Sequence, residues 1–591
     1  MPEMLRRSVV NFTPPVVLIA LVRLLRVTLG VHFPTVLVAF LAVLSVPVVY
    51  VLRIRLRRLR VRWALARTGT ILPPSWDTEY FGNRDLLKYF LQQFKTGYIG
   101  DGPWEKIDEL GHLHAITIFG DTTYLTNDAN VVKTILATDF SDFEKGAEFR
   151  DSMNSVLGTG VFNADGELWK FHRQMTRPYF SRDRITHFEI FDRHADLAIR
   201  KMKERFKGGH AVDFQDLISR FTLDSASEFL FGTCVNSLKS DLPYAYNDPI
   251  APKFAREPSA ADKFSTAFQG AQHVIAMRTR EGWTWHWWEL WQDKSAEHMR
   301  VVDSFLQPIL EEATAKKHAT KALDGTGEHK VDESETLLDH LVKITNDPVI
   351  LHDEMLNILI AGRDTTAATL TFVVYLMCLY PDVFRRLRAE ILEKVGPTQM
   401  PSFDDVRNMK YLRAVINETL RLYPIVPFNF RVAVRDTTLP NPADPAGPRV
   451  FIPANTGIAY SVFLMHRRKD YWGPDALSFD PDRWIDERLN KYFTANPFIF
   501  VPFNAGPRIC LGQQACHFAY NEMSFFLIRL AQNFSHMELD LSAQPPDARP
   551  PPEWASAEGQ KGKEKIIPKC HLTLYVHGGL WVKMTEAERD A

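Results

Sequence analysis

The sequence predicts a mainly α-helical domain with small β-sheets, preceded by an N-terminal membrane anchor. Apolar residues recur at helical spacing through most of the chain, and strand-like alternation is confined to short stretches such as Leu113–Phe119 and Arg449–Ile452. Residues 34–52 are nineteen consecutive positions without a charged side chain, enough to cross a bilayer as a helix. A dense run of arginines follows at once.

Charge is distributed unevenly along the 591 residues. The net formal charge is −1, yet residues 1–67 contain eleven arginines and a single acid, Glu3. Arginines clustered between Arg53 and Arg67 mark the cytosolic side of a span. The earlier apolar stretch 14–29 contains two arginines, so it is either a second span or a helix lying in the membrane interface. Both topologies leave the rest of the chain in the cytosol, with membrane lipid and no nucleic acid as a partner.

The domain boundary is predicted at the Leu72-Pro73-Pro74 break, because each proline fixes φ and forces the preceding residue into an extended conformation. We assign residues 1–72 to the anchor and basic linker, and residues 73–591 to one globular domain. Two further stretches, 316–334 and 541–563, are expected to be surface loops. The five cysteines form no paired spacing, which indicates a reducing compartment without disulfides.

The strongest chemical signal is V-P-F-N-A-G-P-R-I-C-L-G-Q-Q, residues 501–514. Cys510 lies between Gly506 and Gly512, directly before an amphipathic helical pattern whose apolar face includes Cys516. Glycine lets a flat ligand approach the backbone, and the N-terminus of a helix stabilises a thiolate. A thiolate in this setting is a suitable axial ligand for haem iron. The alternative is a buried free cysteine ahead of a core helix.

A second signal interrupts a long predicted helix between residues 347 and 380, with Asp347 as its N-cap. Within it, A-G-R-D-T-T at 361–366 places poor helix formers in the middle of a strong helix. Thr365 can bond back to the carbonyl of Ala361 and open the helix, leaving room for dioxygen and water beside Asp364. The alternative is a kinked core helix.

Two charged pairs complete the set of motifs. Glu418 and Arg421 lie three apart among apolar residues in I-N-E-T-L-R-L-Y-P, which predicts a buried ion pair. Such a pair needs a further partner, and Arg483 in F-D-P-D-R-W is the natural candidate. Trp169 and Arg173 lie four apart, on one helical face.

These motifs, in this order, resemble the cytochrome P-450 superfamily of the eukaryotic microsomal type over about residues 73–585. The pattern F-x-x-G-x-R-x-C-x-G resembles its haem-binding signature, and A-G-R-D-T-T its distal-helix motif. The resemblance implies haem b ligated by Cys510. It makes Glu418, Arg421 and Arg483 a structural triad, and 141–164 a loop over the haem edge. The cofactor contacts that it implies are Trp169, Arg173, Arg431, Phe503, Gly506, Arg508 and Gly512.

The implied activity is that of a monooxygenase, which inserts one oxygen atom of O2 into a hydrophobic substrate, with Asp364 and Thr365 relaying protons. No glycine-rich dinucleotide fingerprint is present, so NADPH-cytochrome P-450 reductase is the expected electron donor, and cytochrome b5 an accessory one. The expected location is the endoplasmic reticulum membrane. The sequence is similar to fungal hydroxylases of alkanes and fatty acids, some relatives of which oxidise polycyclic aromatic, terpenoid or steroid-like compounds.

Two other functions compete with this interpretation. A haem-thiolate isomerase or peroxygenase would not need the acid and alcohol at Asp364 and Thr365. A membrane-anchored haem sensor would explain Cys510 but leave the disturbed helix without a purpose. Five tryptophans between Trp283 and Trp291 fit a core element, a substrate channel wall or a membrane-interface belt, and we favour a membrane-facing element.

Overall fold

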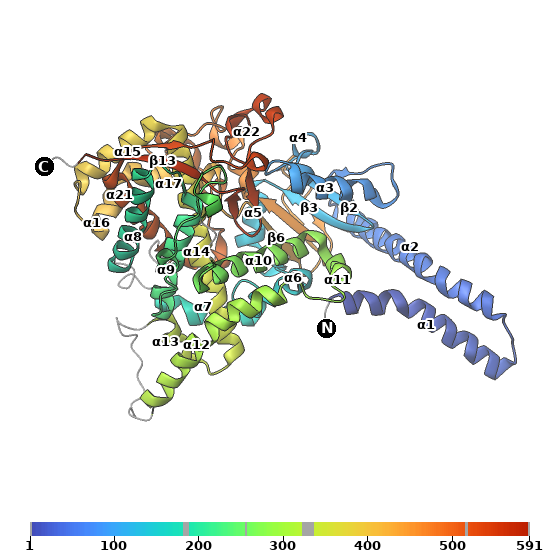
Figure 1. Ribbon diagram of the computed structural model, residues 1–591. Coiled ribbons are helices and arrows are strands. Elements are labelled where there is room, and N and C mark those ends of the chain that lie inside the picture. The colour runs from blue at the N-terminus through green and yellow to red at the C-terminus, as the bar shows by residue number, and fades with distance from the viewer. Residues whose placement is uncertain (1–2, 181–187, 254–256, 322–335, 515–517, 589–591) are drawn as a thin grey trace.

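The computed structural model describes residues 3–180, 188–253, 257–321, 336–514 and 518–588. A helical body surrounds the long helix α14 (Pro348–Leu379), a two-helix arm projects from the body, and the sheet that contains β2 (Leu113–Ile118) and β3 (Asp121–Thr126) lies toward the arm (Figure 1). The predicted mainly helical fold with small sheets is therefore confirmed. Cys516, predicted on the face of a helix, lies outside the described residues.

The arm consists of α1 (Glu3–Leu29) and α2 (Thr35–Thr68), which pack side by side as a hairpin (Figure 1). Among the described helices, α2 alone is long and apolar enough to cross a bilayer as one unbent span. Its apolar side chains face outward, and Val36 is 81% exposed. The helix ends because Gly69 adopts a left-handed φ of 67° and its N–H bonds to the carbonyl of Leu65. An exposed apolar helix of this length fits a membrane anchor.

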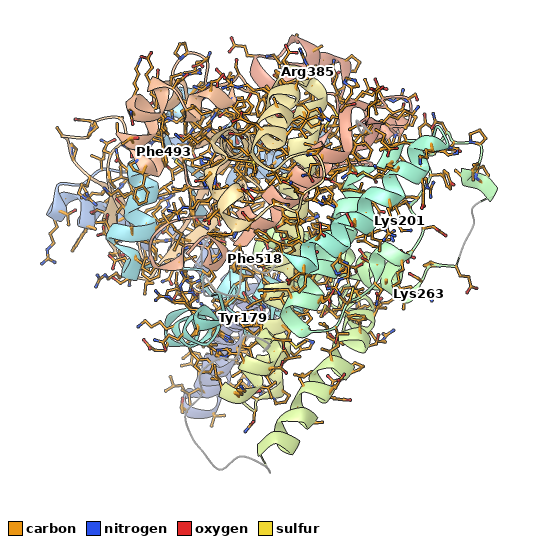
Figure 2. The ribbon with its side chains drawn as sticks, turned by 90° about the vertical axis from the view of Figure 1, so that its left-hand side faces the viewer. Tyr179, Lys201, Lys263, Arg385, Phe493 and Phe518 are labelled. Atoms are coloured by element: carbon orange, nitrogen blue, oxygen red, sulfur yellow. The ribbon has the colours of Figure 1, made fainter. Side chains whose placement is uncertain are left out.

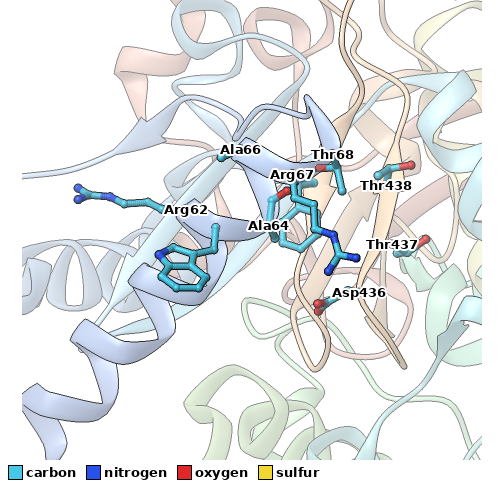
Figure 3. Close-up of a pocket in the computed structure, with 10 residues that line it drawn as sticks. Arg62, Ala64, Ala66, Arg67, Thr68, Asp436, Thr437 and Thr438 are labelled. Carbon is cyan, nitrogen blue, oxygen red and sulfur yellow. Dashed lines mark hydrogen bonds between the residues drawn. The ribbon is translucent and has the colours of Figure 1, made fainter.

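The basic end of α2 is attached to the body beside β7 (Thr437–Leu439) and β8 (Val450–Ile452). The Tyr50 hydroxyl donates to the carbonyl of Phe119, and Arg57 donates to the Thr456 hydroxyl at 3.4 Å. An open cleft separates the last turns of α2 from these strands (Figure 3). Its lining residues are Arg62, Trp63, Ala64, Ala66, Arg67, Thr68, Asp436, Thr437, Thr438 and Phe451.

The body is built mainly from helices packed around α14. Asp347 caps α14 by accepting from Val349 N at 2.9 Å, as the sequence predicts, and Pro381 follows its end. The helices before it are α3 (Arg84–Thr96), α4 (Ile107–Leu110), α5 (Ala129–Lys133), α6 (Ala147–Leu157), α7 (Gly166–Thr176), α8 (Glu189–Lys207), α9 (Phe214–Phe231), α10 (Ala260–Glu281), α11 (Trp285–Trp288), α12 (Ala296–Lys321) and α13 (Leu337–Ile344). Those after it are α15 (Pro381–Lys394), α16 (Phe403–Asn408), α17 (Lys410–Leu422), α18 (Val462–Met465), α19 (Lys469–Trp472), α20 (Leu511–Gln514), α21 (Phe518–Asn533) and α22 (Gly559–Lys563).

The sheets are short, and the largest lies on the side of the body next to the arm (Figure 1). The largest has the strand order β1-β2-β3-β9-β6-β4, in which β2 and β3 form a hairpin and β3 runs parallel to β9. Its strands are β1 (Ser75–Trp76), β2 (Leu113–Ile118), β3 (Asp121–Thr126), β9 (Gly457–Ser461), β6 (Phe428–Ala433) and β4 (Phe143–Glu144). The remaining pairings are β10 (Phe534–Leu539) with β13 (Trp581–Glu586) and β5 (Val212–Asp213), β11 (Pro568–Cys570) with β12 (Leu574–Val576), and β7 with β8.

Aromatic contacts join helices that are distant in sequence. The ring of Tyr179 lies 5.4 Å from Phe229, which stacks on Phe518 at 4.9 Å (Figure 2 labels the two outer residues). These contacts connect the segment after α7 to α9 and to α21, the long helix that comes after the short helix α20. Packing of this kind adds to the apolar burial that stabilises the fold.

Three predicted loops differ in the structure. Segment 141–164 contains helix α6, because its apolar residues Met153, Val156 and Leu157 bury one helical face. Residues 316–321 continue helix α12, and the rest of the 316–334 stretch lies outside the described residues. The 541–563 stretch contains short helices and buries Trp554, so it is part of the body.

Glu564, at the end of that last stretch, is a buried carboxylate that joins three segments. It accepts hydrogen bonds from the hydroxyls of Tyr98, Tyr375 and Tyr423 at 2.9, 2.6 and 2.7 Å. Burial raises the pKa of Glu564, while the three tyrosine hydrogen bonds and nearby Arg467 oppose that rise. The C-terminal segment is thereby fastened to α14, to the end of α17 and to the chain after α3.

The tryptophan-rich segment lies at the surface beside α1. Trp287, Trp288 and Trp291 are 51%, 67% and 94% exposed, which excludes a core role for these three. Trp285 lies under the guanidinium of Arg278 at 4.3 Å. The Trp283 side chain lies outside the described part of the structure. Exposed indoles next to an exposed apolar helix are typical of a membrane-facing surface.

Deleting residues 1–72 is expected to move the protein from the membrane pellet to the supernatant, because α2 supplies most of the exposed apolar surface. The measurement is sedimentation of expressing-cell membranes, with circular dichroism to verify the fold. As a control, the full-length chain with Trp287, Trp288 and Trp291 changed to serine should stay in the pellet. Membrane binding by the deleted chain would instead make the tryptophan surface the main anchor.

Candidate haem-binding site

The loop that carries Cys510 is shaped by close backbone contacts. Gly506 has a φ of 68°, and a Cβ there would lie 1.8 Å from the carbonyl oxygen of Leu136, so only glycine fits. The N–H of Cys510 donates to the carbonyl of Phe503 at 3.0 Å, and α20 begins at the next residue. A Cβ on Gly512 would approach the Cys510 sulfur to 3.7 Å. The Cys510 side chain is exposed, which leaves its sulfur accessible to a ligand.

Basic side chains gather beside this loop around Asp165, which pairs with Arg150 as well as with Arg508. Arg508 donates to the Asp165 carboxylate at 2.8 Å and to the carbonyl of Ala164 at 2.7 Å. Arg431, on β6, is 2% exposed, and among the described residues neither Arg431 nor Lys145 forms an ion pair with a carboxylate. Burial and the neighbouring Arg431 lower the pKa of Arg508 to about 10. Burial and both arginines lower the pKa of Lys145 well below its ordinary value.

Helix α7 adds an aromatic surface and a further cation. Trp169 is 7% exposed, and the guanidinium carbons of Arg508 and Arg173 lie 4.7 and 6.0 Å from its ring centroid. Burial lowers the pKa of Arg173, and the nearby Cys510 opposes that shift. The predicted residues Trp169, Arg173 and Arg508 are therefore close together beside the cysteine loop.

This donor set fits a haem. An accessible thiolate can ligate the iron, and glycine at 506 holds the loop close to its neighbour. The excess of positive charge at the buried Arg431 and the partly buried Arg508 and Lys145 matches two propionate carboxylates, which would restore charge balance. Lys145 has no sequence signal of its own, because it reaches the site only through the pairing of β4 with β6.

Helix α14 presents the predicted acid and alcohol. The Thr365 hydroxyl donates to the carbonyl of Ala361 at 2.7 Å, as predicted, although α14 stays continuous through this segment. Ala361, Gly362, Asp364 and Thr365 are partly exposed in the middle of an otherwise buried helix, so they border open space.

The Asp364 carboxylate is turned toward α10. It pairs with Arg363 at 2.9 Å and lies beside Gln272. Burial raises the pKa of Asp364, and Arg363 and Gln272 partly oppose that rise. An acid in this state holds a proton closer to neutral pH than an exposed aspartate does.

The three triad residues come together in the interior, and all are 0% exposed. Arg421 forms a two-pronged pair with Glu418 at 2.8 and 2.7 Å, and the Arg483 Nε lies 3.5 Å from Glu418. Arg483 directs its hydrogen bonds to Asp475. Burial opposes ionisation of Glu418, but Arg421 and Arg483 hold its pKa below the ordinary value.

A buried histidine connects this ion pair to the cysteine loop. The carbonyl of His466 accepts from Arg421 at 2.9 Å, and its Nε2 accepts from the N–H of Val501 at 3.0 Å. Nδ1 lies 3.4 Å from the carbonyl of Leu420, so the ring is neutral with its proton on Nδ1. Burial and the nearby Arg421 lower the pKa of His466 to about 3. The sequence analysis missed this residue, because nothing local distinguishes it from other histidines.

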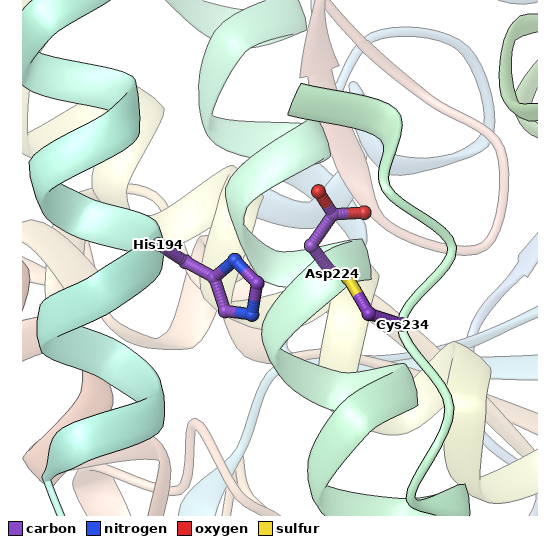
Figure 4. A group of neighbouring side chains, drawn as sticks. All are labelled: His194, Asp224 and Cys234. Carbon is purple, nitrogen blue, oxygen red and sulfur yellow. The ribbon is translucent and has the colours of Figure 1, made fainter. Parts of the chain in front are cut away.

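A second cluster of ligating side chains lies elsewhere, between α8 and the end of α9. The ligand atoms of His194, Asp224 and Cys234 are all within 4.8 Å of one another (Figure 4). The Asp224 carboxylate already accepts from the Ser237 N–H and hydroxyl at 2.7 and 2.8 Å and from the Leu238 N–H at 2.9 Å. These bonds make Asp224 a cap for the loop after α9, which accounts for its burial without a metal ion.

An accessible, glycine-framed cysteine beside an excess of cations, together with a buried helix that is partly exposed at its centre, fits the class of haem-thiolate proteins. The cytochrome P450 family model matches residues 90–558, and the chain belongs to this family. It is 38% identical over 428 residues to cytochrome P450 52E1 of Candida apicola, covering 72% of this chain and 77% of that protein. It is also 37% identical over 463 residues to cytochrome P450 52A6 of Candida tropicalis, covering 77% and 79%.

A longer alignment extends over most of both chains. Cytochrome P450 52A5 of Candida maltosa is 35% identical over 529 residues, which cover 88% of this chain and 92% of that protein. The resemblance stated from the motifs is therefore confirmed, and the chain is a cytochrome P450 monooxygenase with fungal relatives.

Changing Glu418 to alanine is expected to lower the free energy of unfolding by about 3–5 kcal/mol, because it leaves Arg421 buried without its partner. Urea denaturation followed by circular dichroism measures the effect. The matched control is Glu393→Ala on the surface of α15, which should unfold as the unaltered protein does. Equal free energies of unfolding for the two variants would show that the Glu418–Arg421 pair does not stabilise the fold.

His466 predicts acid sensitivity. Its pKa is about 3 in the folded protein and 6.5 when unfolded, so only the unfolded state gains a proton as pH falls from 6.5. Its stabilising contribution is complete above pH 6.5 and falls by about 1.4 kcal/mol per pH unit below it, or about 2 kcal/mol at pH 5. In His466→Gln, which can still accept from Val501, the slope of stability between pH 6.5 and 5, followed by urea denaturation, should fall by about 1.4 kcal/mol per pH unit, and the share of His571, whose pKa is also about 3, should remain.

The control for that titration is His352→Gln. Hydrogen bonds to Asp303 and Asp353 raise the pKa of His352 to about 9, so its stabilising contribution is complete below pH 6.5 and is lost as pH rises through 9. The control should therefore keep the acid slope and change the profile above pH 6.5. An acid slope in His466→Gln equal to that of the unaltered protein would assign the effect to another group.

Proposed function

We propose that this P450 inserts one oxygen atom of O2 into long-chain alkanes or fatty acids, or into related hydrophobic compounds. The observation that carries the proposal is the acid and alcohol of α14, which border open space in a buried helix. A haem-thiolate isomerase or a haem sensor has no use for a proton-carrying pair at this position. Relatives named as members of P450 subfamily 52 in Candida species support the substrate class.

The proposed cofactor is haem b. It supplies dioxygen activation at an iron made electron-rich by its thiolate ligand. Cys510 holds the iron, and Gly506 and Gly512 keep the ligand loop close. Arg431, Arg508 and Lys145 neutralise the propionates.

The remaining cofactor contacts come from aromatic and basic side chains near the same loop. Trp169 and Arg173 hold one edge of the site, and Phe503 fixes the loop through its carbonyl. Glu418, Arg421 and Arg483 act from behind the loop as positioning residues.

Proton delivery is assigned to Asp364 and Thr365. The raised pKa of Asp364 lets it hold a proton, and Arg363 fixes its carboxylate. Thr365 must release its bond to the Ala361 carbonyl in order to donate toward the open space, and that bond keeps the hydroxyl oriented between transfers. General acid catalysis of this kind contributes about 10²–10⁴-fold.

The partners follow from what the chain lacks and where its charge lies. It contains no glycine-rich dinucleotide fingerprint, so electrons come from a membrane-bound NADPH-cytochrome P-450 reductase, with cytochrome b5 as an accessory donor. The anchor helix and the arginines after it favour the endoplasmic reticulum membrane with the body in the cytosol.

The test is turnover of the full chain in reductase-containing vesicles. Thr365→Ala is expected to consume NADPH but release peroxide, lowering hydroxylated product per NADPH, and Asp364→Asn should slow turnover. Cys510→Ala is the negative control and should lose the red-shifted carbon monoxide band of a thiolate-ligated haem. A product ratio in Thr365→Ala equal to that of the unaltered enzyme would remove the proton-relay assignment.

A further inference from the structure

Two arginines near the end of α10 have different surroundings. Arg278 is 1% exposed and pairs with the carboxylates of Glu289 and Asp293, both at 2.5 Å. It also donates to the hydroxyl of Ser155 at 2.7 Å. The charge of Arg278 is thus balanced within the protein, and its role is structural.

Arg280, two residues further on, has no such balance. Its guanidinium lies over the ring of Phe94 at 3.8 Å and donates to the carbonyls of Ala276, Cys570 and His571 at 2.8, 2.7 and 3.3 Å. Within the described part of the chain, no carboxylate pairs with it. Burial lowers the pKa of Arg280, and the guanidinium has five N–H groups of which the carbonyls occupy three. A partly buried cation with spare donors is a binding site for an anion.

The groups around Arg280 are also basic. His273 lies two turns earlier on α10, and His571 lies in the turn between β11 and β12. Burial, followed by Arg280, His273 and Arg363, lowers the pKa of His571 to about 3, so these groups are close enough to repel one another. Asp364 is already paired with Arg363, so it does not balance Arg280. Because the pKa values of both histidines are lowered, the positive charge to be matched is that of Arg280 itself.

The distance along α10 relates this charge to the proposed catalytic site. Gln272 lies beside Asp364, and Arg280 follows eight residues later, which is about 12 Å along a helix axis. A molecule whose anionic end is at Arg280 must therefore be a long chain if its other end is to reach Asp364 and Thr365. The Arg280 guanidinium contacts the β11–β12 hairpin through the Cys570 carbonyl and α3 through the ring of Phe94. These two elements therefore lie at the anionic end.

We propose that Arg280 binds the carboxylate end of the substrate, so that long-chain acids are favoured over alkanes and alcohols of equal length. This inference rests on the proposed function and selects among its substrate classes. His273 shares the site as a neutral donor. The carboxylate restores charge balance at Arg280, while the apolar chain runs along α10 toward α14.

The experiment measures binding to the oxidised full-length holoprotein by the Soret shift that a ligand causes when it displaces water from the haem. The probes are hexadecanoic acid, hexadecan-1-ol and hexadecane. Arg280→Gln, which keeps two N–H donors for the surrounding carbonyls, should bind the acid at least tenfold more weakly and the alcohol unchanged. Arg280→Lys should keep most of the preference for the acid. Arg385→Gln removes the same charge from an exposed site on α15 and is the matched control (Figure 2).

Equal weakening of acid and alcohol binding in Arg280→Gln would make Arg280 a structural tie to the β11–β12 turn and overturn the proposal. Equal affinities of the two probes for the unaltered protein would also overturn it, while leaving the monooxygenase assignment in place. Failure of the unaltered protein to hydroxylate any of the three probes would instead count against the proposed function.

Discussion

The buried ion pair of Glu418 and Arg421 is the constraint on which the cysteine loop depends. With no water available, each charge must be satisfied by the protein, and Arg421 does so by donating to three carbonyls in the 466–478 segment. Glu418 accepts from the N–H of Asp480 and the indole of Trp484. The pair thereby holds the irregular 466–484 segment in place. His466 links this segment to the cysteine loop by accepting a hydrogen bond from the N–H of Val501. The Glu418–Arg421 pair therefore helps to fix the position of the Cys510 sulfur, although neither charged group is placed to contact the cofactor.

Positive charge without an internal partner marks two separate places in the body. One lies beside the cysteine loop, where Arg431 and Lys145 lie near the cluster that Asp165 forms with Arg508 and Arg150. The other lies at the end of α10. The fully buried Arg278, Arg421 and Arg483 are matched by carboxylates. The partly buried Arg413 and Arg467 instead lie over the aromatic rings of Tyr520 and Phe463. Because an unmatched cation costs stability when it is buried, the two places named above fit anions that arrive with a ligand.

The sequence was informative where partners are a few residues apart. The cap at Asp347, the back-bond of Thr365 and the pairing of Glu418 with Arg421 all follow from helical spacing. Contacts made across the fold had no such signal: Lys145 reaches the site through strand pairing, and His466 through packing. The 541–563 stretch was mistaken for a surface loop because its prolines conceal the burial of residues around Trp554, which only the tertiary structure supplies.

The match to the family ends at residue 558, six residues before Glu564. A chain cut at that point would lose the acceptor shared by Tyr98, Tyr375 and Tyr423 and leave three phenolic hydroxyls in a dry interior. It would also lose the β11–β12 turn against which Arg280 lies. Residues 559–588 are therefore an internal brace between segments that are far apart in the sequence. Because the three hydroxyls share one acceptor, they stay without it in any nascent chain that has not yet reached residue 564.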